Sequence, residues 1–301
     1  MENSLLIAIL AGLGGMLGWG LADFFAKKTI DEIGDIASLA WAHIFGTLAL
    51  FLVVAHNIIF FERKIVMPSD TYTWIILIFF GVLQAAVYFF LYRGFGKGQV
   101  SLLSPIFASF AGITAIMSIV FFGEAVNMFL IFALIVIFCG NLLINIDPQI
   151  FKTKRFAFTK ITGFKEIALA TLLAALWTLL WGKFVNSQDW LLYALFMYGF
   201  MTLAILMLVK LQKINLSISI SKSSIWKFLV FIGLFEVMAY LAVSFGYSAT
   251  SRISVIALLS GAFSLPLIIL ARIFLKEKVL PIQRMGSIVI ILGIMLLALL
   301  K

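Results

Sequence analysis

Long apolar runs dominate the pattern of hydrophobic and polar positions along this chain. Each run is continuous and about 20 residues long, which is the length that an α-helix needs to cross the hydrocarbon core of a bilayer. The runs do not alternate as the strands of a membrane barrel would, so helices are the expected spanning elements. The pattern predicts an all-α integral membrane protein with ten spans, at roughly 4–25, 36–56, 73–93, 101–122, 127–146, 166–184, 190–209, 226–247, 253–275 and 281–300.

The spans form two repeats. The stretches 101–143 and 254–296 align without a gap, and Glu124 of the first falls on Glu277 of the second. Each repeat holds five spans, an odd number, so the second must enter the membrane in the opposite direction. The sequence therefore predicts an inverted-topology repeat, with a first five-helix unit at 1–147, a basic linker at 148–165 and a second unit at 166–301. In this architecture a substrate site lies near the midplane between the halves.

Composition agrees with a membrane protein that has little soluble mass. Of the 301 residues, 64% are hydrophobic and 12% are charged, against roughly half and a quarter in soluble domains. The first residues, Met1 to Asn3, lack the basic segment of a signal peptide, so the first span is expected to be retained. The single cysteine, Cys139, allows no internal disulfide and no multi-cysteine metal site.

The span at 226–247 has a carboxylate, Glu236, at its middle. A charge at that depth is costly unless it meets a partner or a water-filled cavity, which makes it a candidate for substrate binding or ion coupling. The matching stretch of the first half, 74–94, carries Gln84 at the equivalent position. The predicted cavity is therefore asymmetric, with this charge in the second half only.

Several other polar residues lie four positions from an aromatic, on the same helix face. If these faces converge, they form an aromatic cavity that suits small organic molecules and could hold a cation against its rings. The candidate residues for substrate binding or coupling are Glu236, Gln84, Tyr88, Tyr240, Trp19, Trp181, His43 and Asp23.

Structural interpretations of the same residues stay open at this point. Glu236 and Gln84 could instead form hydrogen bonds that join helices. Asp23 lies near the expected end of its span, beside two lysines, where a solvated cap or an ion pair would serve as well. His43 could titrate or simply pack. Pro105 and Pro266 predict bends that expose backbone carbonyls, with a gating role or a packing role.

The chain resembles the EamA-type transporters of the drug/metabolite transporter superfamily over essentially its whole length. Besides the five-plus-five plan, the resemblance rests on short motifs: Gly18-Trp19-Gly20, Pro105, Gly123-Glu124, Lys276-Glu277, and the small residues Ala133, Gly140, Gly286 and Gly293. It implies a central cavity lined by both halves, and export or exchange of small metabolites. The chain departs from the family pattern at His43, where an arginine is usual, and at Leu258, the counterpart of Pro105.

These observations predict a secondary transporter of small metabolites such as amino acids or related amines, working by alternating access, with the proton as a candidate coupling ion. A flippase-like lipid-handling protein and a non-transporting scaffold subunit are the alternatives. No Walker loop or zinc-binding motif occurs, so no enzyme, cofactor or metal site is expected. A nucleic-acid partner is not expected either, because the sequence has no contiguous basic domain. The expected location is the cell membrane, as a monomer or a homodimer among lipids.

The orientation in the membrane has two predictions that disagree. The loops on the side of the chain termini hold five of the 22 lysines and arginines: Arg63, Lys64, Lys183, Arg252 and Lys301. The positive-inside rule therefore places both termini outside. The family resemblance implies that the termini lie inside.

Overall fold

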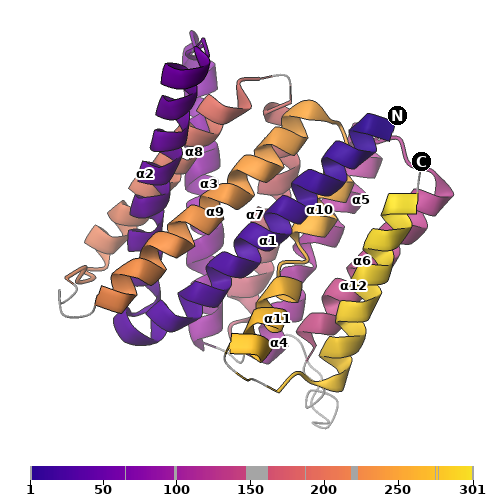
Figure 1. Ribbon diagram of the computed structural model, residues 1–301. Helices are drawn as coiled ribbons and strands as arrows, with labels where there is room; N and C mark the ends of the chain where they lie inside the picture. The colour runs from indigo at the N-terminus through magenta and orange to yellow at the C-terminus, as the bar shows by residue number, and fades with distance from the viewer. Residues whose placement is uncertain are drawn as a thin grey trace.

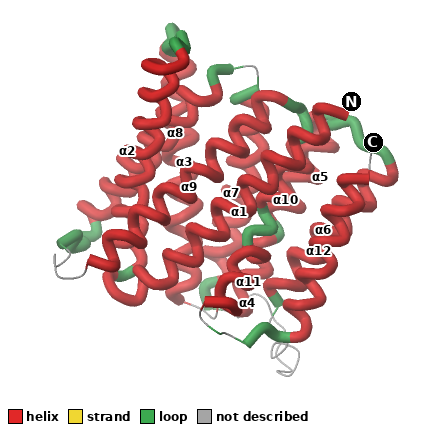
Figure 2. Tube along the Cα trace, viewed as in Figure 1, coloured by secondary structure: helices red, strands yellow, loops and turns green. Residues whose placement is uncertain are grey.

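The computed structural model describes residues 2–64, 66–97, 100–146, 162–186, 188–217, 223–274, 276 and 278–299. Within these residues every regular element is a helix (Figures 1 and 2). The helices are α1 (Glu2–Ile33), α2 (Asp35–Phe61), α3 (Thr71–Lys97), α4 (Val100–Ala108), α5 (Phe110–Phe122), α6 (Met128–Asn145), α7 (Phe164–Phe184), α8 (Trp190–Leu211), α9 (Ser223–Ala249), α10 (Ile253–Ser260), α11 (Ser264–Phe274) and α12 (Pro281–Leu299).

Ten stretches of the described chain are long and apolar enough to cross a membrane, which confirms the predicted fold class. The first of them differs in length from the prediction. The sequence predicts an end near residue 25, but α1 continues to Ile33. Charged residues end the apolar stretch of a span without ending the helix. The helix ends before Gly34, whose φ of 84° is a conformation that favours glycine. Asp23 therefore lies inside the helix and not at its end.

Two spans are broken in the middle, in corresponding places of the two halves. The fourth span divides at Ser109 into α4 and α5, and the ninth divides at residues 261–263 into α10 and α11 (Figure 2). Pro105 lies before the first break and Pro266 after the second. At the break in the fourth span, the carbonyl oxygen of Ile106 accepts hydrogen bonds from the hydroxyl groups of Ser109, at 2.6 Å, and Thr171, at 3.2 Å.

The two halves interlock instead of lying side by side. In Figure 1, α1 and α9 run along each other through the centre of the molecule. The matching pair, α7 and α3, is in contact in the same way, and so are the matching pairs α2 with α9 and α8 with α3. This exchange of neighbours is what an inverted repeat produces, since each inner helix of one half packs on the inner helices of the other.

Small residues set the close approach of these helices. A side chain at Gly18 of α1 would meet the backbone of Phe235 and Ala239 in α9. Between α6 and α12, a side chain at Gly140 or Gly286 would likewise meet backbone atoms of the facing helix. In a bilayer the association of helices depends on such packing, because lipid tails are as apolar as the side chains.

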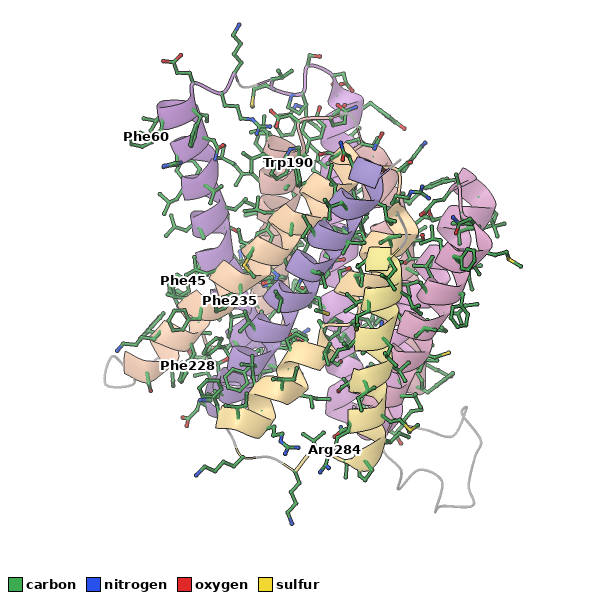
Figure 3. The ribbon with its side chains drawn as sticks, turned by 45° about the vertical axis from the view of Figure 1, so that its right-hand side comes forward. Phe45, Phe60, Trp190, Phe228, Phe235 and Arg284 are labelled. Atoms are coloured by element: carbon green, nitrogen blue, oxygen red, sulfur yellow. The ribbon has the colours of Figure 1, made fainter. Side chains whose placement is uncertain are left out.

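The two ends of the bundle differ in charge. The chain termini lie at one end in Figure 1, which we call the terminal end. In Figure 3, Phe60 and Trp190 lie toward that end and Arg284 lies at the opposite one. The opposite end, here the basic end, carries most of the described lysines and arginines, among them Arg93, Lys210 and Arg272. The predicted basic linker spans 148–165, and residues 147–161 are outside the described part of the chain.

Candidate functional site

Glu236 lies near the middle of α9, where its apolar neighbours would place it inside a bilayer. Its side chain is buried, with 4% of its residue surface exposed. The hydroxyl of Tyr88 in α3 donates to Oε1 of Glu236 at 2.6 Å, and the hydroxyl of Tyr198 in α8 donates to Oε2 at 3.0 Å. The carboxylate is thus held by one tyrosine from each half of the chain.

His43 of α2 provides the third contact of this carboxylate. Its Nδ1 lies 2.9 Å from the carbonyl oxygen of Leu39, and its Nε2 lies 3.4 Å from Oε1 of Glu236. The imidazole is completely buried and stacks on Tyr198 at 5.3 Å between ring centroids. The three rings around the acid, from Tyr88, Tyr198 and His43, exclude lipid from it.

The Leu39 contact fixes which nitrogen of His43 carries hydrogen. A carbonyl oxygen only accepts hydrogen bonds, so Nδ1 must donate. A neutral imidazole would then turn the lone pair of Nε2 toward Glu236, and an ionised carboxylate there would repel it. Nε2 of His43 is buried and forms no hydrogen bond within the described residues. Its approach to Oε1 of Glu236 at 3.4 Å is a close contact between the two side chains.

Gln84, the counterpart of Glu236, forms the matching contact on the other side. Its Nε2 donates to the hydroxyl of Tyr240 at 2.8 Å. Its Oε1 is buried and has no hydrogen-bond partner in the described structure. The indole Nε1 of Trp19 is likewise buried without a partner. Unpartnered polar atoms are costly in a membrane interior, and two of them beside one cavity point to a ligand or water.

Two adjoining cavities lie beside these residues, and both are lined by Trp19, Asp23 and Tyr88. The first, here the acidic cavity, has a volume of about 30 Å³ and includes Glu236. The second, here the aromatic cavity, has a volume of about 90 Å³; its other lining residues include Gln84, Phe107, Phe110, Trp177 and Phe263. Phe110 and Phe263 are repeat counterparts that flank the two helix breaks, so the broken spans deliver equivalent side chains to one cavity.

Most of the candidates from the sequence meet here. Glu236, Tyr88 and His43 are in direct contact, Gln84 and Tyr240 form the second pair, and Trp19 and Asp23 line the cavities. Trp181 does not line them: its Nε1 donates to Ser244 at 3.1 Å, and its ring stacks behind Trp177 at 5.8 Å. The proline side chains do not line either cavity, although Pro266 contacts the position of Gly20 in α1.

Tyr198 is the contact of Glu236 that sequence reasoning missed. It has no polar counterpart in the other half that would single it out. One signal was present: Tyr198 and Thr202 are polar residues four apart within an apolar span, and the Thr202 hydroxyl bonds to the carbonyl of Tyr198 at 3.0 Å. The ring of Tyr198 reaches the site because Gly46 of α2 leaves room for its hydroxyl.

The bundle is closed between the cavities and the terminal end. Glu124, at the end of the fourth span, accepts hydrogen bonds from Ser118, at 2.7 Å, and from the hydroxyl of Ser254 in α10, at 2.5 Å. It also accepts the backbone N–H of Ser254 at 2.9 Å, which caps the start of α10. Trp181 and Tyr247 are fully buried in the same layer. The equivalent acid of the second half, Glu277, lies outside the described residues.

These features together define an inverted-repeat membrane protein with the architecture of a secondary transporter. A model of the EamA-like transporter family matches residues 6–146 and 162–299, one match for each half. The chain therefore belongs to the EamA-like transporter family, whose members are transporters and not enzymes, and it is a membrane transporter of the drug/metabolite type.

Comparison with solved structures supports the fold. Twenty-nine chains match, and one, described only as the crystal structure of a protein, superposes with a TM-score of 0.75 at 12% identity, covering 97% of this chain and 96% of that one. At this identity the likeness concerns the fold alone. No curated protein matches the sequence.

Proposed function

We propose that this protein is a proton-coupled secondary transporter that exports or exchanges small metabolites such as amino acids or related amines. It works by alternating access around the two cavities in the cell membrane. Glu236 and His43 hold the coupling proton. The substrate binds beside them in the aromatic cavity.

One observation carries this proposal: a buried acid at mid-membrane depth is held jointly by both halves of an inverted repeat. Glu236 accepts hydrogen bonds from Tyr88 of the first half and Tyr198 of the second, and it faces His43 at 3.4 Å. An intramembrane acid that pairs with other helices beside a cavity is typical of substrate and ion pathways. A proton that leaves this pair changes the charge at the seam where the halves would move.

The closed layer at the terminal end supports alternating access. The cavities lie between this layer and the basic end, because Asp23, Tyr88 and Tyr92 belong to the parts of α1 and α3 nearest the basic end. Movement of one half against the other would release the contact of Glu124 with Ser254 and close the opposite side. In this scheme the helix breaks near Pro105 and Pro266 serve as the flexible points.

Flux in proteoliposomes tests the function. Purified protein is reconstituted, and exchange and net transport of a panel of amino acids and amines are measured with and without a pH gradient. We expect flux of at least one compound above protein-free liposomes, with a rate that depends on the gradient. Absence of flux for every compound, with correctly folded and inserted protein, would contradict transport, and flux that ignores the gradient would contradict proton coupling.

Lipid handling is the second candidate, and one feature favours it. A groove of about 520 Å³ lies among α2, α3 and α8 and is lined by Asp35, Arg93 and apolar side chains. It shares Leu39 and Tyr92 with the acidic cavity. A basic and an acidic group beside an apolar wall could receive a zwitterionic headgroup. Movement of a labelled phospholipid across the same proteoliposomes would support this alternative. The scaffold alternative gains no support from a chain that encloses such cavities.

A further inference from the structure

We infer that the aromatic cavity selects small organic amines that carry no carboxylate, in preference to the amino acids from which they differ by that group alone. The inference rests on the proposed transport function and narrows its substrate class. It follows from the charges and the walls of the two cavities and from the free acceptor of Gln84. The unpartnered indole N–H of Trp19 is a neutral donor, so it does not offset the charge of a carboxylate.

The ionisable side chains that line the two cavities are acids and tyrosines. Asp23 lines both cavities, and Glu236 lines the acidic one; no lysine or arginine is among their described lining residues. His43, the nearest basic group, is already engaged with Glu236. Arg93 lines the separate groove with Asp35. The carboxylate of a bound amino acid would therefore find no lysine or arginine among the described lining residues and would face Asp23, an acid of its own sign.

The free acceptor in the aromatic cavity suits an N–H donor. Gln84 is 8% exposed, and because its Nε2 is used by Tyr240, the atom left without a partner is the acceptor Oε1. An ammonium group has donors only, so it can satisfy Oε1 and a carboxylate at once. The Asp23 side chain lines both cavities, is exposed, and forms no ion pair with any other residue whose side chain is described. Gln84 and Asp23 are thus two acceptor-bearing residues in the lining of the aromatic cavity.

The walls suit the cation and its apolar body. Trp19 and Trp177 each meet the ring of Tyr240 edge to face, at 5.7 and 5.8 Å between centroids, so their positions are fixed by packing. The indole N–H of Trp177 is used by the carbonyl of Phe80 at 3.2 Å, which leaves its ring as the surface available to a ligand. Aromatic faces attract ammonium groups, most strongly where water is excluded.

The volume limits the size of the ligand. The aromatic cavity of about 90 Å³ adjoins the acidic cavity of about 30 Å³. An engineered cavity of about 150 Å³ holds benzene, so the volume of this state favours amines smaller than a phenyl one. The carboxylate that an amino acid adds at the polar end would need room and a counter-charge, and the cavity supplies neither.

Binding to the protein in lipid nanodiscs tests the inference, since leakage of neutral amines across liposomes does not affect it. Titration calorimetry is run with 3-methylbutylamine, with leucine, which is the same molecule plus a carboxylate, and with 4-methylpentanoate, which has the carboxylate without the amine. The phenyl series of 2-phenylethylamine, phenylalanine and 3-phenylpropionate is run beside it. We expect an amine to bind at least about tenfold more tightly than its amino acid, and the acids not to bind.

Two variants locate the binding. Asp23→Asn should weaken amine binding at least about tenfold, while Asp35→Asn, which changes an acid of the neighbouring groove, should leave it unchanged. Equal or tighter binding of the amino acid, binding of a carboxylate without the amine, or no binding of any compound would overturn the inference. If an amino acid bound as tightly as its amine and flux were also measured, the inference would be overturned and the transport function would stand. If the amine bound but no flux were measured, that result would count against the transport function alone.

Discussion

Tyr88 of the first half donates a hydrogen bond of 2.6 Å to Glu236 of the second, and the repeat counterparts of these two residues, Tyr240 and Gln84, make the reciprocal contact at 2.8 Å. Each half thus supplies a tyrosine to the polar group of the other. The pseudo-symmetry of the fold extends to these two contacts but not to charge, because one pair contains an acid and the other an amide. His43 contacts the acidic pair only, so the proton coupling that we propose would belong to one side of the symmetric arrangement.

Glu236→Gln should abolish transport driven by a pH gradient while the protein still folds. Glutamine keeps an oxygen for one of the two tyrosines, Tyr88 and Tyr198, and its amide nitrogen can donate to the hydroxyl of the other, but it cannot hold the proton. We expect gradient-driven flux to fall at least about tenfold and counterflow of substrate to persist in part. Monodisperse elution and an unchanged unfolding temperature are the controls. Equal dependence on the gradient in the variant and the original chain would remove Glu236 from coupling.

His43→Gln should separate coupling from substrate binding. The variant loses the proton-accepting Nε2 but leaves the acid and the aromatic cavity in place, so amine binding should persist while the pH dependence of flux flattens. His56→Gln is the matched control, because His56 is exposed on the same helix beside Phe60. A pH profile of His43→Gln that coincides with that of the control would show that His43 only packs.

The double change Gln84→Glu with Glu236→Gln moves the acid to the other side of the pseudo-symmetric arrangement. The acid would then meet Tyr240 and keep a negative charge in the aromatic cavity, but it would lose His43. We expect amine binding to be at least as tight as in Glu236→Gln alone, and proton coupling to stay lost. Calorimetry and gradient-driven flux measured on the same preparation distinguish the two. Full recovery of coupling would mean that any acid between the halves suffices.

Tyr88→Phe and Tyr240→Phe form a matched pair for the two contacts. Removing the hydroxyl of Tyr88 takes a hydrogen bond from an ionisable acid, which costs about 1.5–3 kcal/mol when the acid is charged, whereas the bond from Gln84 is between neutral groups and is worth about 0.5–1.5 kcal/mol. Thermal unfolding in nanodiscs should therefore show the larger loss for Tyr88→Phe. Similar losses for the two variants would indicate that Glu236 is uncharged in the resting state, and the reverse order would contradict the stronger bond of Tyr88.

Gly286→Ala tests the packing of α6 against α12. The added Cβ would lie 2.5 Å from the backbone nitrogen of Ile144, and backbone cannot move aside easily. We expect a loss of about 1–3 kcal/mol in stability. Gly199→Ala in α8 is the control, since nothing lies within 4 Å of its added Cβ, and it should be neutral or stabilise by about 0.5–1 kcal/mol. Similar unfolding temperatures for the two variants would contradict the close contact.

The sequence by itself determined the spans, the inverted repeat and the pairing of Gln84 with Glu236, because these depend on hydropathy and on internal similarity, which are local or one-dimensional properties. It also indicated which residues were costly to bury. It predicted the end of the first helix too early, since the end depends on a glycine beyond the hydrocarbon and not on the last apolar residue.

The tertiary structure alone decided which of these residues meet. Tyr198 joins the acid and Trp181 turns away from the cavities, although both are aromatics in long apolar spans. The difference comes from the rotation of each helix about its axis, which is set by packing between the halves, such as the space that Gly46 leaves for Tyr198. His43 comes within 3.4 Å of Glu236, an acid 193 positions later in the chain, only through the fold. Contacts of that kind arise from the fold as a whole and leave no periodic signal in the sequence.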